Sequence, residues 1–387
     1  MPNSKCKTRS PMDGTNNMKK LVIGIDANEA NRANRVGTGQ YAYHILWQWY
    51  KTSGADFHLY LRDALVGDMP PERDGWQYHI IGPRTAWTRF ALPLHLLTGT
   101  RHDVFWNPAH YLPPIVPGKS VVTIHDLAYE YFPDLFLKKD LYKLKNWTRS
   151  SVARATRVIA VSEATKKDVV AAYAAPEGKI AVVHNGYDSA TFNIHRKDID
   201  KSILENWKLK NANYVLFLGT IQPRKNAIKL IQAFHLLKES GYKGKLVLAG
   251  NIGWMADETL RVAKESPDAK DIVLTGYVSD EARLVLYSNA DVYVLPSLYE
   301  GFGVPALEAM ACGAPAAVAD NSSLPEVVGD AAELFNAADP ADIARAVMAV
   351  RANRESYIKR GLARVKKFSW EKCARETLNV LETVAHG

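Results

Sequence analysis

The chain has 387 residues, of which 47% are hydrophobic and 23% are charged, and its formal net charge is +8. This length is too great for one ordinary hydrophobic core and suggests two or three domains, and the composition is typical of a soluble globular protein. No apolar run approaches the roughly 18 residues that a transmembrane helix requires, so the sequence predicts no membrane-spanning helix.

Positive charge gathers at two places in the first half of the chain. Residues 1–20 hold five bases and one acid, and residues 1–19 lack the apolar core of a secretory signal, so we expect a disordered basic tail. Residues 138–157 hold seven bases and one acid. A solvated helix face, an anionic membrane surface and a phosphate-bearing substrate are all compatible with this second group. No recognition motif supports a nucleic-acid partner.

The first predicted strand is followed by a glycine pair. Residues 21–26 (LVIGID) form a short apolar run typical of a buried parallel strand. After a polar loop come Gly37, Thr38 and Gly39, and an apolar-periodic helix is expected from Gln40 to about Tyr50. Between the first strand and the first helix, an open α/β sheet binds ligands. We therefore predict a ligand or phosphate loop at Gly37, Thr38 and Gly39, with a simple turn as the alternative.

Strands and helices then alternate, which predicts parallel sheets with right-handed crossovers. In the first half, strands are expected at residues 57–61, 76–81, 104–106, 121–124, 158–161 and 180–183, and helices at 139–155 and 163–173. After a polar linker at 188–207, strands are expected at 214–219, 245–249, 272–275 and 292–295, and helices at 227–238, 280–288, 304–312 and beyond 340. Two such α/β units leave a ligand cleft between the carboxyl ends of their strands.

Four further stretches lie in the first half and the linker. His125 and Asp126 end a predicted strand, where the histidine either orients ligand hydroxyls or moves a proton, or serves as a core or capping residue. Residues 87–97 (WTRFALPLHLL) are expected either to be buried or to form a docking surface. Ser162 is expected to cap the helix that follows it. Residues 198–200 (DID) follow no buried strand, so their likeness to a metal-binding Asp-x-Asp is treated as chance.

Two cations follow the first strand of the second half. Residues 219–226 (GTIQPRKN) place Arg224 and Lys225 at a strand-to-helix turn, near free backbone N–H groups. Arginine forks onto two oxygens and lysine acts as a compact charge, which suits a diphosphate. The alternative is a surface turn with two exposed bases.

Residues 297–315 (SLYEGFGVPALEAMACGAP) predict a strand, a glycine-rich turn and a helix N-terminus. Free N–H groups and the helix dipole favour an anionic ligand there. Glu300 lies on the turn and Glu308 in the helix, and carboxylates accept hydrogen bonds from sugar hydroxyls. Gly301 and Gly303 let the backbone approach a ligand closely. An exposed helix acid and a tight turn are the alternative interpretation.

This last block resembles, nearly residue for residue, the Glu-x7-Glu signature of the retaining nucleotide-sugar glycosyltransferases of family 4, also called glycosyl transferase group 1. The resemblance extends from Leu21 to about Ala385 and includes the Arg224–Lys225 turn and the His125–Asp126 pair. It implies two Rossmann-like domains facing a cleft, the GT-B fold. It places an acceptor-binding domain at residues 20–190 and a donor-binding domain at 191–369, with a C-terminal helix at 370–387 that crosses back to the first domain.

The resemblance also implies the roles of the site residues. Glu300, His125 and Lys225 would be catalytic. The donor would contact Arg224, Lys225, Glu300, Gly301, Phe302, Gly303, Val304 and Glu308, and the loop at Gly37, Thr38 and Gly39 would contact the acceptor or a phosphate. Many members carry Gly-Arg where this chain has Gly219 and Thr220, so the arginine role passes to Arg224. The resemblance implies no cofactor and no metal, because the cation pair neutralises the leaving diphosphate.

The expected function is retaining transfer of a hexose, mannose from GDP-mannose, to a glycan or lipid-linked glycan in polysaccharide or cell-envelope biosynthesis. A UDP-sugar donor, a phosphorylase-like or epimerase-like enzyme of the same fold, and a non-catalytic sugar-nucleotide-binding protein are the alternatives. Cys6, Cys312 and Cys373 are widely spaced and form no disulfide framework, which suggests the cytoplasm. Peripheral contact with the inner face of the cytoplasmic membrane would follow if the basic groups bind lipid.

Overall fold

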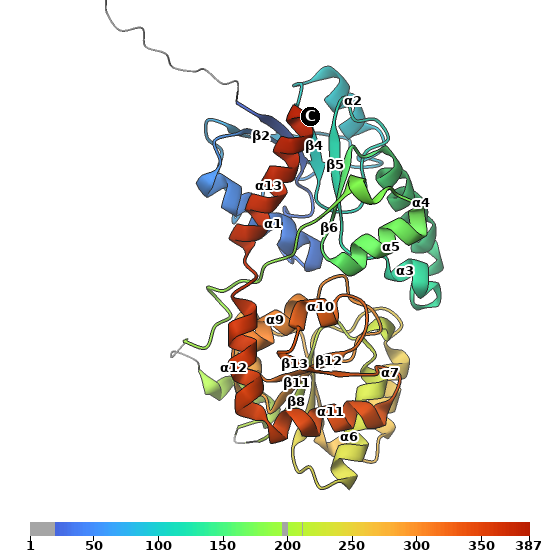
Figure 1. Ribbon diagram of the computed structural model, residues 1–387, viewed down its shortest axis with the longest axis vertical. Helices are drawn as coiled ribbons and strands as arrows, with labels where there is room; N and C mark the ends of the chain where they lie inside the picture. Colours follow the sequence, from blue (N-terminus) through green and yellow to red (C-terminus); the bar gives the residue numbers. More distant parts are fainter. Residues whose placement is uncertain (1–19, 196–199, 211) are drawn as a thin grey trace, which may run out of the picture.

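The computed structural model describes residues 20–195, 200–210 and 212–387 and contains two parallel β-sheets, one in each half of the elongated molecule (Figure 1). The expected basic tail lies outside the described residues, and so do Asp198 and Ile199 of the DID stretch. No helix of the described part is long and apolar enough to cross a membrane.

The first sheet has seven parallel strands in the order β3-β2-β1-β4-β5-β6-β7. Helices cover it on both faces, which explains why its central strands read as continuous apolar runs. The order reverses between β1 and β4, and ligands of open sheets bind beside such a reversal. The strands are β1 Val22–Asp26, β2 Asp56–Leu61, β3 Trp76–Ile80, β4 Val104–Asn107, β5 Ser120–Ile124, β6 Arg157–Ala160 and β7 Ile180–Val182.

The C-terminal helix packs on the first sheet although it comes last in the sequence (Figure 1). Trp370, Cys373 and Leu381 lie in the same hydrophobic core as the first strands, and the Trp49 indole N–H donates to the Ala374 carbonyl at 2.8 Å. The predicted return of the chain is therefore confirmed. The helices around this sheet are α1 Gly37–Thr52, α2 Ala91–Thr98, α3 Ala128–Tyr131, α4 Lys138–Arg154, α5 Glu163–Tyr173 and α13 Trp370–His386.

The second sheet has six parallel strands in the order β10-β9-β8-β11-β12-β13, with its reversal between β8 and β11. Its strands are β8 Tyr214–Leu218, β9 Lys245–Ala249, β10 Ile272–Gly276, β11 Val292–Leu295, β12 Ala316–Ala319 and β13 Ala332–Phe335. Its helices are α6 Ala227–Glu239, α7 Asp257–Glu265, α8 Asp280–Asn289, α9 Val304–Ala311, α10 Leu324–Val328, α11 Pro340–Ala352 and α12 Arg354–Val365. Two Rossmann-like sheets, as the sequence predicts, thus follow one another along the chain.

The apolar stretch at residues 87–97 is partly buried and partly exposed, so both expectations for it hold in part. It contains most of α2, whose buried side and exposed side carry different hydrophobic residues. Trp87, Leu92 and Leu96 are buried in the core of the first sheet. Phe90 and Leu94 lie on the exposed side, where Phe90 keeps 69% of its surface accessible.

A cluster of four histidines lies beside the edge of the first sheet. His58 Nδ1 is 2.8 Å from His79 Nε2, and the Tyr60 hydroxyl is 2.9 Å from His102 Nε2. The rings of His79 and His95 lie 5.7 Å apart. Burial, together with the neighbouring histidines, lowers the pKa of His102 to about 4, and burial also lowers the pKa values of His58 and His79. Burial in the folded protein therefore disfavours protonation of His58, His79 and His102.

We expect the free energy of unfolding to fall as the pH is lowered from about 7 to about 5. The unfolded chain protonates its histidines near pH 6.5, whereas folded His102 resists protonation down to about pH 4. Each proton that only the unfolded chain binds costs about 1.4 kcal/mol of stability per pH unit. His102→Asn should flatten the fall in a calorimetric pH series, and His235→Gln should not, because the hydrogen bond with Asp268 raises the pKa of His235. Equal slopes in wild type and His102→Asn would contradict this account.

Candidate active site

The two cations and the first signature acid meet at the strand-order reversal of the second sheet. Lys225 follows β8 and Glu300 follows β11, and Lys225 Nζ lies 2.5 Å from Glu300 Oε1. Arg224 Nη1 donates to the Tyr299 carbonyl at 2.5 Å and lies 3.5 Å from Glu300 Oε2. The Ser297 hydroxyl donates to Glu300 Oε1 at 2.6 Å. Residues that the sequence predicts in separate motifs thus form one charged cluster.

Burial makes this cluster electrostatically strong. Glu300 is 7% exposed, and burial alone would raise its pKa, but Lys225 and Arg224 outweigh burial and lower the pKa to about 2. Burial lowers the pKa of Lys225, with Glu300 opposing this effect. Arg224 Nε is buried and has no hydrogen-bond partner among the described residues. The cluster therefore holds a carboxylate at neutral pH, together with an N–H donor that has unused bonding capacity.

A left-handed asparagine positions the cation turn. Pro223–Lys225 form a single 3-10 turn, and Asn226 ends it with φ of 58°. The Asn226 side-chain amide donates to the carbonyls of Pro296 and Ala337, at 3.0 and 2.8 Å. Asparagine tolerates this backbone conformation better than most residues. Asn226 therefore ties the cation turn to the segment that leads into the glycine-rich turn of the Glu-x7-Glu block, residues 299–303. We call these residues the signature turn.

The signature turn is held within its own domain and also packs tightly against the first domain. Within the second domain, Glu300 N donates to the Ser322 hydroxyl, and the Ser323 hydroxyl donates to Glu300 O, each at 2.9 Å. A Cβ on Gly301 would lie 1.7 Å from the carbonyl oxygen of His125, so only glycine fits there. Gly303 has φ of 99° and immediately precedes α9, which begins at Val304.

Phe302, the remaining donor residue expected in the turn, is buried. Its ring packs against those of His184 and Phe368, with centroids 5.8 and 5.7 Å away. The side chain of Phe302 therefore supports the turn by packing. A donor contact by the backbone of residues 301–304 stays a prediction.

Glu308, the second signature acid, has a separate set of partners. It projects from α9 and accepts hydrogen bonds from Arg283 and from the Tyr287 hydroxyl, the latter at 3.2 Å. Burial raises the pKa of Glu308, and the Arg283 guanidinium opposes that rise. Arg283 lies on α8 and was not foreseen from the sequence, because α8 has the pattern of an ordinary surface helix. The predicted contact of Glu308 with a ribose stays a prediction.

His125 is buried at the carboxyl end of β5. Its Nε2–H donates to the Pro108 carbonyl at 2.7 Å, and its ring makes an edge contact with Tyr41 at 4.7 Å. Burial and the neighbouring His110 lower the pKa of His125 to about 3. The imidazole is therefore neutral at physiological pH, and its backbone carbonyl adjoins Gly301.

The prediction of a loop at Gly37, Thr38 and Gly39 is wrong, because these residues form the first turn of α1. Gly39 N donates to the Val36 carbonyl at 2.7 Å, so the helix begins three residues before Gln40. A Cβ on Gly39 would lie 2.8 Å from the Glu29 carbonyl oxygen. The second glycine therefore allows close packing of the helix start, which still presents N–H groups to a ligand.

Asp26 and Asn107 form a second polar contact that no sequence motif indicates. They end β1 and β4, the two strands at the reversal of the first sheet, and Asn107 Nδ2 donates to Asp26 Oδ2 at 3.0 Å. Burial raises the pKa of Asp26 to about 6, with Asn28 opposing this rise. The sequence signal for Asp26 is its position as an acid at the end of the apolar LVIGID run. No group of three or more His, Cys, Asp or Glu residues that could hold a metal ion occurs within residues 20–195, 200–210 and 212–387.

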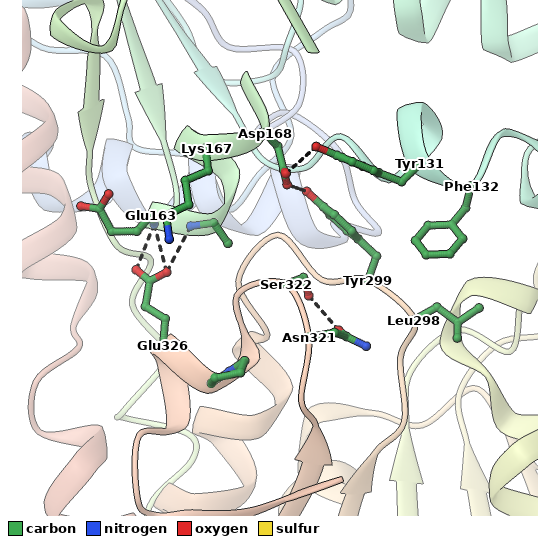
Figure 2. A pocket seen from close by; sticks show the side chains of 12 residues that line it. Tyr131, Phe132, Glu163, Lys167, Asp168, Leu298, Tyr299, Asn321, Ser322 and Glu326 are labelled. Atoms are coloured by element: carbon green, nitrogen blue, oxygen red, sulfur yellow. Dashed lines mark hydrogen bonds between the residues drawn. The ribbon is translucent and has the colours of Figure 1, made fainter. Parts of the chain in front are cut away.

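A pocket of about 590 Å³ borders the signature turn (Figure 2). One wall comes from the first domain, through Tyr131, Lys167 and Asp168, and the other from the second, through Tyr299 and Glu326. The two domains therefore face each other across polar and aromatic side chains next to the charged cluster.

Comparison with known proteins agrees with this arrangement. The model of the family "Glycosyl transferases group 1" matches residues 198–362, and that of "Glycosyltransferase Family 4" matches residues 81–191. O-antigen chain mannosyltransferase B of Escherichia coli is 32% identical over 311 residues, which are 78% of each chain. A GDP-mannose-dependent alpha-(1-6)-phosphatidylinositol dimannoside mannosyltransferase of Mycobacterium tuberculosis is 31% identical over 204 residues, 52% of this chain and 51% of that one.

The solved structures agree in fold. HepE of Anabaena, solved with UDP and glucose, is 16% identical, covers 94% of this chain and 99% of its own, and superposes with a TM-score of 0.73. At this identity the likeness concerns the fold alone. Since the Escherichia coli relative is matched over most of its length, the chain belongs to the group 1, family 4 glycosyltransferases, and the protein is a glycosyltransferase.

Proposed function

We propose that this glycosyltransferase moves mannose from GDP-mannose to a glycan or lipid-linked glycan, with retention of anomeric configuration. The observation that carries the proposal is the buried cluster of Arg224, Lys225 and Glu300, at the strand-order reversal of the second sheet. Cations near helix N-termini stabilise a departing diphosphate, and a carboxylate accepts from sugar hydroxyls. The mannosyltransferase relatives favour mannose as the sugar, and one of them is described as GDP-mannose-dependent.

In the proposed reaction, the bond between the sugar C1 and the diphosphate oxygen breaks as the acceptor oxygen attacks C1 from the same face. The acceptor hydroxyl gives its proton to the departing phosphate. Lys225 and Arg224 neutralise the charge that develops on the diphosphate. Glu300 and Glu308 accept from the sugar and the ribose. His125, whose pKa lies near 3, needs no proton transfer in this scheme and orients the sugar.

No metal or cofactor takes part in this proposal, because Arg224 and Lys225 supply the positive charge that a metal would otherwise provide. The backbone N–H groups of the signature turn add to this charge. A neutral His125 is consistent with this reaction. Because the acceptor attacks C1 on the same face as the departing diphosphate, its hydroxyl proton passes to the phosphate.

A product assay over a panel of nucleotide sugars tests the donor. With a mannose-terminated oligosaccharide as acceptor, GDP-mannose is expected to give a longer product, and UDP-glucose and UDP-galactose are not. Transfer from a UDP-sugar alone would favour the alternative donor. Binding of GDP-mannose without transfer to this oligosaccharide would argue against a mannose-terminated glycan as the acceptor.

We further propose peripheral contact with the inner face of the cytoplasmic membrane. Helix α4 carries six of the seven bases of residues 138–157. Arg89, just before α2, lies 5.5 Å from the Trp147 ring of α4, so the exposed apolar side of α2 and the basic helix are neighbours. Each base near an anionic surface contributes about 1 kcal/mol.

Anionic vesicles are therefore expected to sediment the protein at low salt, and neutral vesicles are not. Reversing the charges of Lys138, Lys139 and Lys143 to Glu should weaken binding, as should deletion of residues 1–19. Reversal of Lys264 and Lys270, in the second domain, should not. Because the Debye length is about 10 Å at 0.1 M salt, added salt should release the protein. Equal recovery with neutral and anionic vesicles would mean that the charge is only a solvated surface.

A further inference from the structure

Helix α5 of the first domain holds the signature turn of the second. The carbonyl oxygen of Gly301 lies 2.8 Å from the Ser162 hydroxyl and 3.3 Å from the Thr165 hydroxyl, and both can donate to it. Ser162 also accepts from Thr165 N at 3.0 Å, which confirms it as the N-cap of α5. The cap of one domain's helix is thus also a donor to the backbone next to Glu300.

A second contact from α5 reaches the residue on the other side of Glu300. The Asp168 carboxylate accepts hydrogen bonds from two tyrosines, Tyr131 at 2.6 Å and Tyr299 (Figure 2). Tyr131 belongs to the first domain and Tyr299 to the second, and their rings stack at 5.8 Å. Tyr299 is 6% exposed, and its carbonyl accepts from Arg224. Asp168 is therefore connected through Tyr299 to the cation pair.

In a third contact, a carboxylate of the second domain accepts hydrogen bonds from the first domain. Glu326, on α10 of the second domain, accepts from the backbone N–H groups of Glu163 and Ala164 at the start of α5, at 3.0 and 3.3 Å (Figure 2). It also accepts from His184 Nε2 at 2.7 Å. A carboxylate at a helix N-terminus is stabilised by the free N–H groups and by the helix dipole.

These contacts are polar, and several of them border the pocket between the domains. Interfaces of this kind within a chain resemble transient protein–protein interfaces, and relative motion of the domains is the default expectation for them. Opening would separate Gly301, Tyr299 and Glu326 from α5 together, because all three contacts lie on the first two turns of one helix.

We propose that Asp168 and Glu326 are positioning residues that fasten the two sides of the signature turn to α5, so that Glu300 is held in its working place only when the domains are closed. Asp168 holds Tyr299 before Glu300, and Glu326 holds α5 where Ser162 and Thr165 reach Gly301 after it. Closure and assembly of the donor site are thereby one event. Only the kinetic part of this inference rests on the proposed function.

Two conservative variants with matched controls test the positioning role. Tyr299→Phe keeps the ring and removes the hydrogen bond that Tyr299 donates to Asp168 across the domain interface. Tyr131→Phe removes the other bond to the same carboxylate, within the first domain. Glu326→Gln removes the charge from the start of α5, whereas Glu163→Ala changes only a side chain there and leaves the backbone N–H.

We expect kcat to fall about tenfold in Tyr299→Phe and in Glu326→Gln, as for loss of one hydrogen bond to a charged group, with the donor KM within about threefold of wild type. Both controls should keep wild-type kcat, and all four variants should keep the wild-type Tm within a few degrees. Unchanged kcat in Tyr299→Phe and Glu326→Gln, or equal losses in the controls, would overturn the proposal.

Small-angle scattering of the full chain tests closure without any reaction. Wild type and Glu326→Ala are compared alone, with GDP and with UDP. We expect a larger radius of gyration for the variant in at least one condition, and the same radius for Glu163→Ala as for wild type. Equal radii for wild type and Glu326→Ala in every condition would overturn the inference. Because no transfer is measured, a wrong donor assignment leaves this result decisive.

Discussion

Lys225→Ala is expected to lower kcat/KM well over tenfold while the fold survives. The lysine ammonium lies 2.5 Å from Glu300 in a buried cluster, where charge would develop on the departing diphosphate. Loss of one charge-assisted interaction costs about 1.5–3 kcal/mol, or roughly 10–150-fold in rate. Steady-state kinetics with varied donor would measure the loss, and circular dichroism would check the fold.

A matched control separates catalysis from the general effect of removing a paired lysine. Lys238 pairs with Asp271 at 2.7 Å in the same domain, at the far end of α6. Lys238→Ala should keep wild-type kcat/KM and lose at most a little stability. If Lys225→Ala saturates with donor normally and turns over at the wild-type rate, the role assigned to Lys225 is wrong.

Gly301→Ala is expected to reduce activity about a hundredfold or more. The added Cβ would lie 1.7 Å from the carbonyl oxygen of His125 and 2.7 Å from its carbonyl carbon, and these are backbone atoms that cannot move aside as a flexible side chain could. The signature turn would have to withdraw from the first domain, and a displacement of about 1 Å at a catalytic group can cost about a hundredfold. Each sheet has its own core, so the thermal transition should shift little.

The control for this glycine is Gly54→Ala, since a Cβ there meets nothing within 4 Å. It should leave both activity and Tm at wild-type values. Wild-type activity in Gly301→Ala would show that the close approach of the two domains does not occur in the working enzyme.

Much of the fold could be predicted because each strand and helix carries a local signal. Runs such as residues 214–218 are apolar throughout, as parallel strands buried on both faces require. By contrast, β12 is Ala316–Ala319, four small residues whose sequence does not separate a buried strand from a helix. The start of α1 was misplaced because glycines at residues 37 and 39 read as a turn, whereas Gly39 serves close packing.

The site could be predicted in part. The motifs that carry Lys225 and Glu300 each end a strand, and the rules of open sheets bring such ends together. Glu326 and Asp168 lie on helices with no distinguishing pattern, and their partners are 163 and 131 residues away. Such contacts depend on how two folded domains meet, which no local signal reports. Arg283 lies in the same domain as its partner Glu308, but on another helix 25 residues away in the sequence, so the pattern of α8 alone does not indicate their contact.

Retaining transfer without a metal can be tested in one proton NMR time course. The full-length enzyme is mixed with GDP-mannose and a mannose-terminated acceptor in excess EDTA, and the anomeric signal of the first product is followed. We expect an α-linked mannose to appear in the initial phase at the rate seen without EDTA. A β-linked first product, or a reaction that begins only when Mg²⁺ or Mn²⁺ is restored, would contradict it.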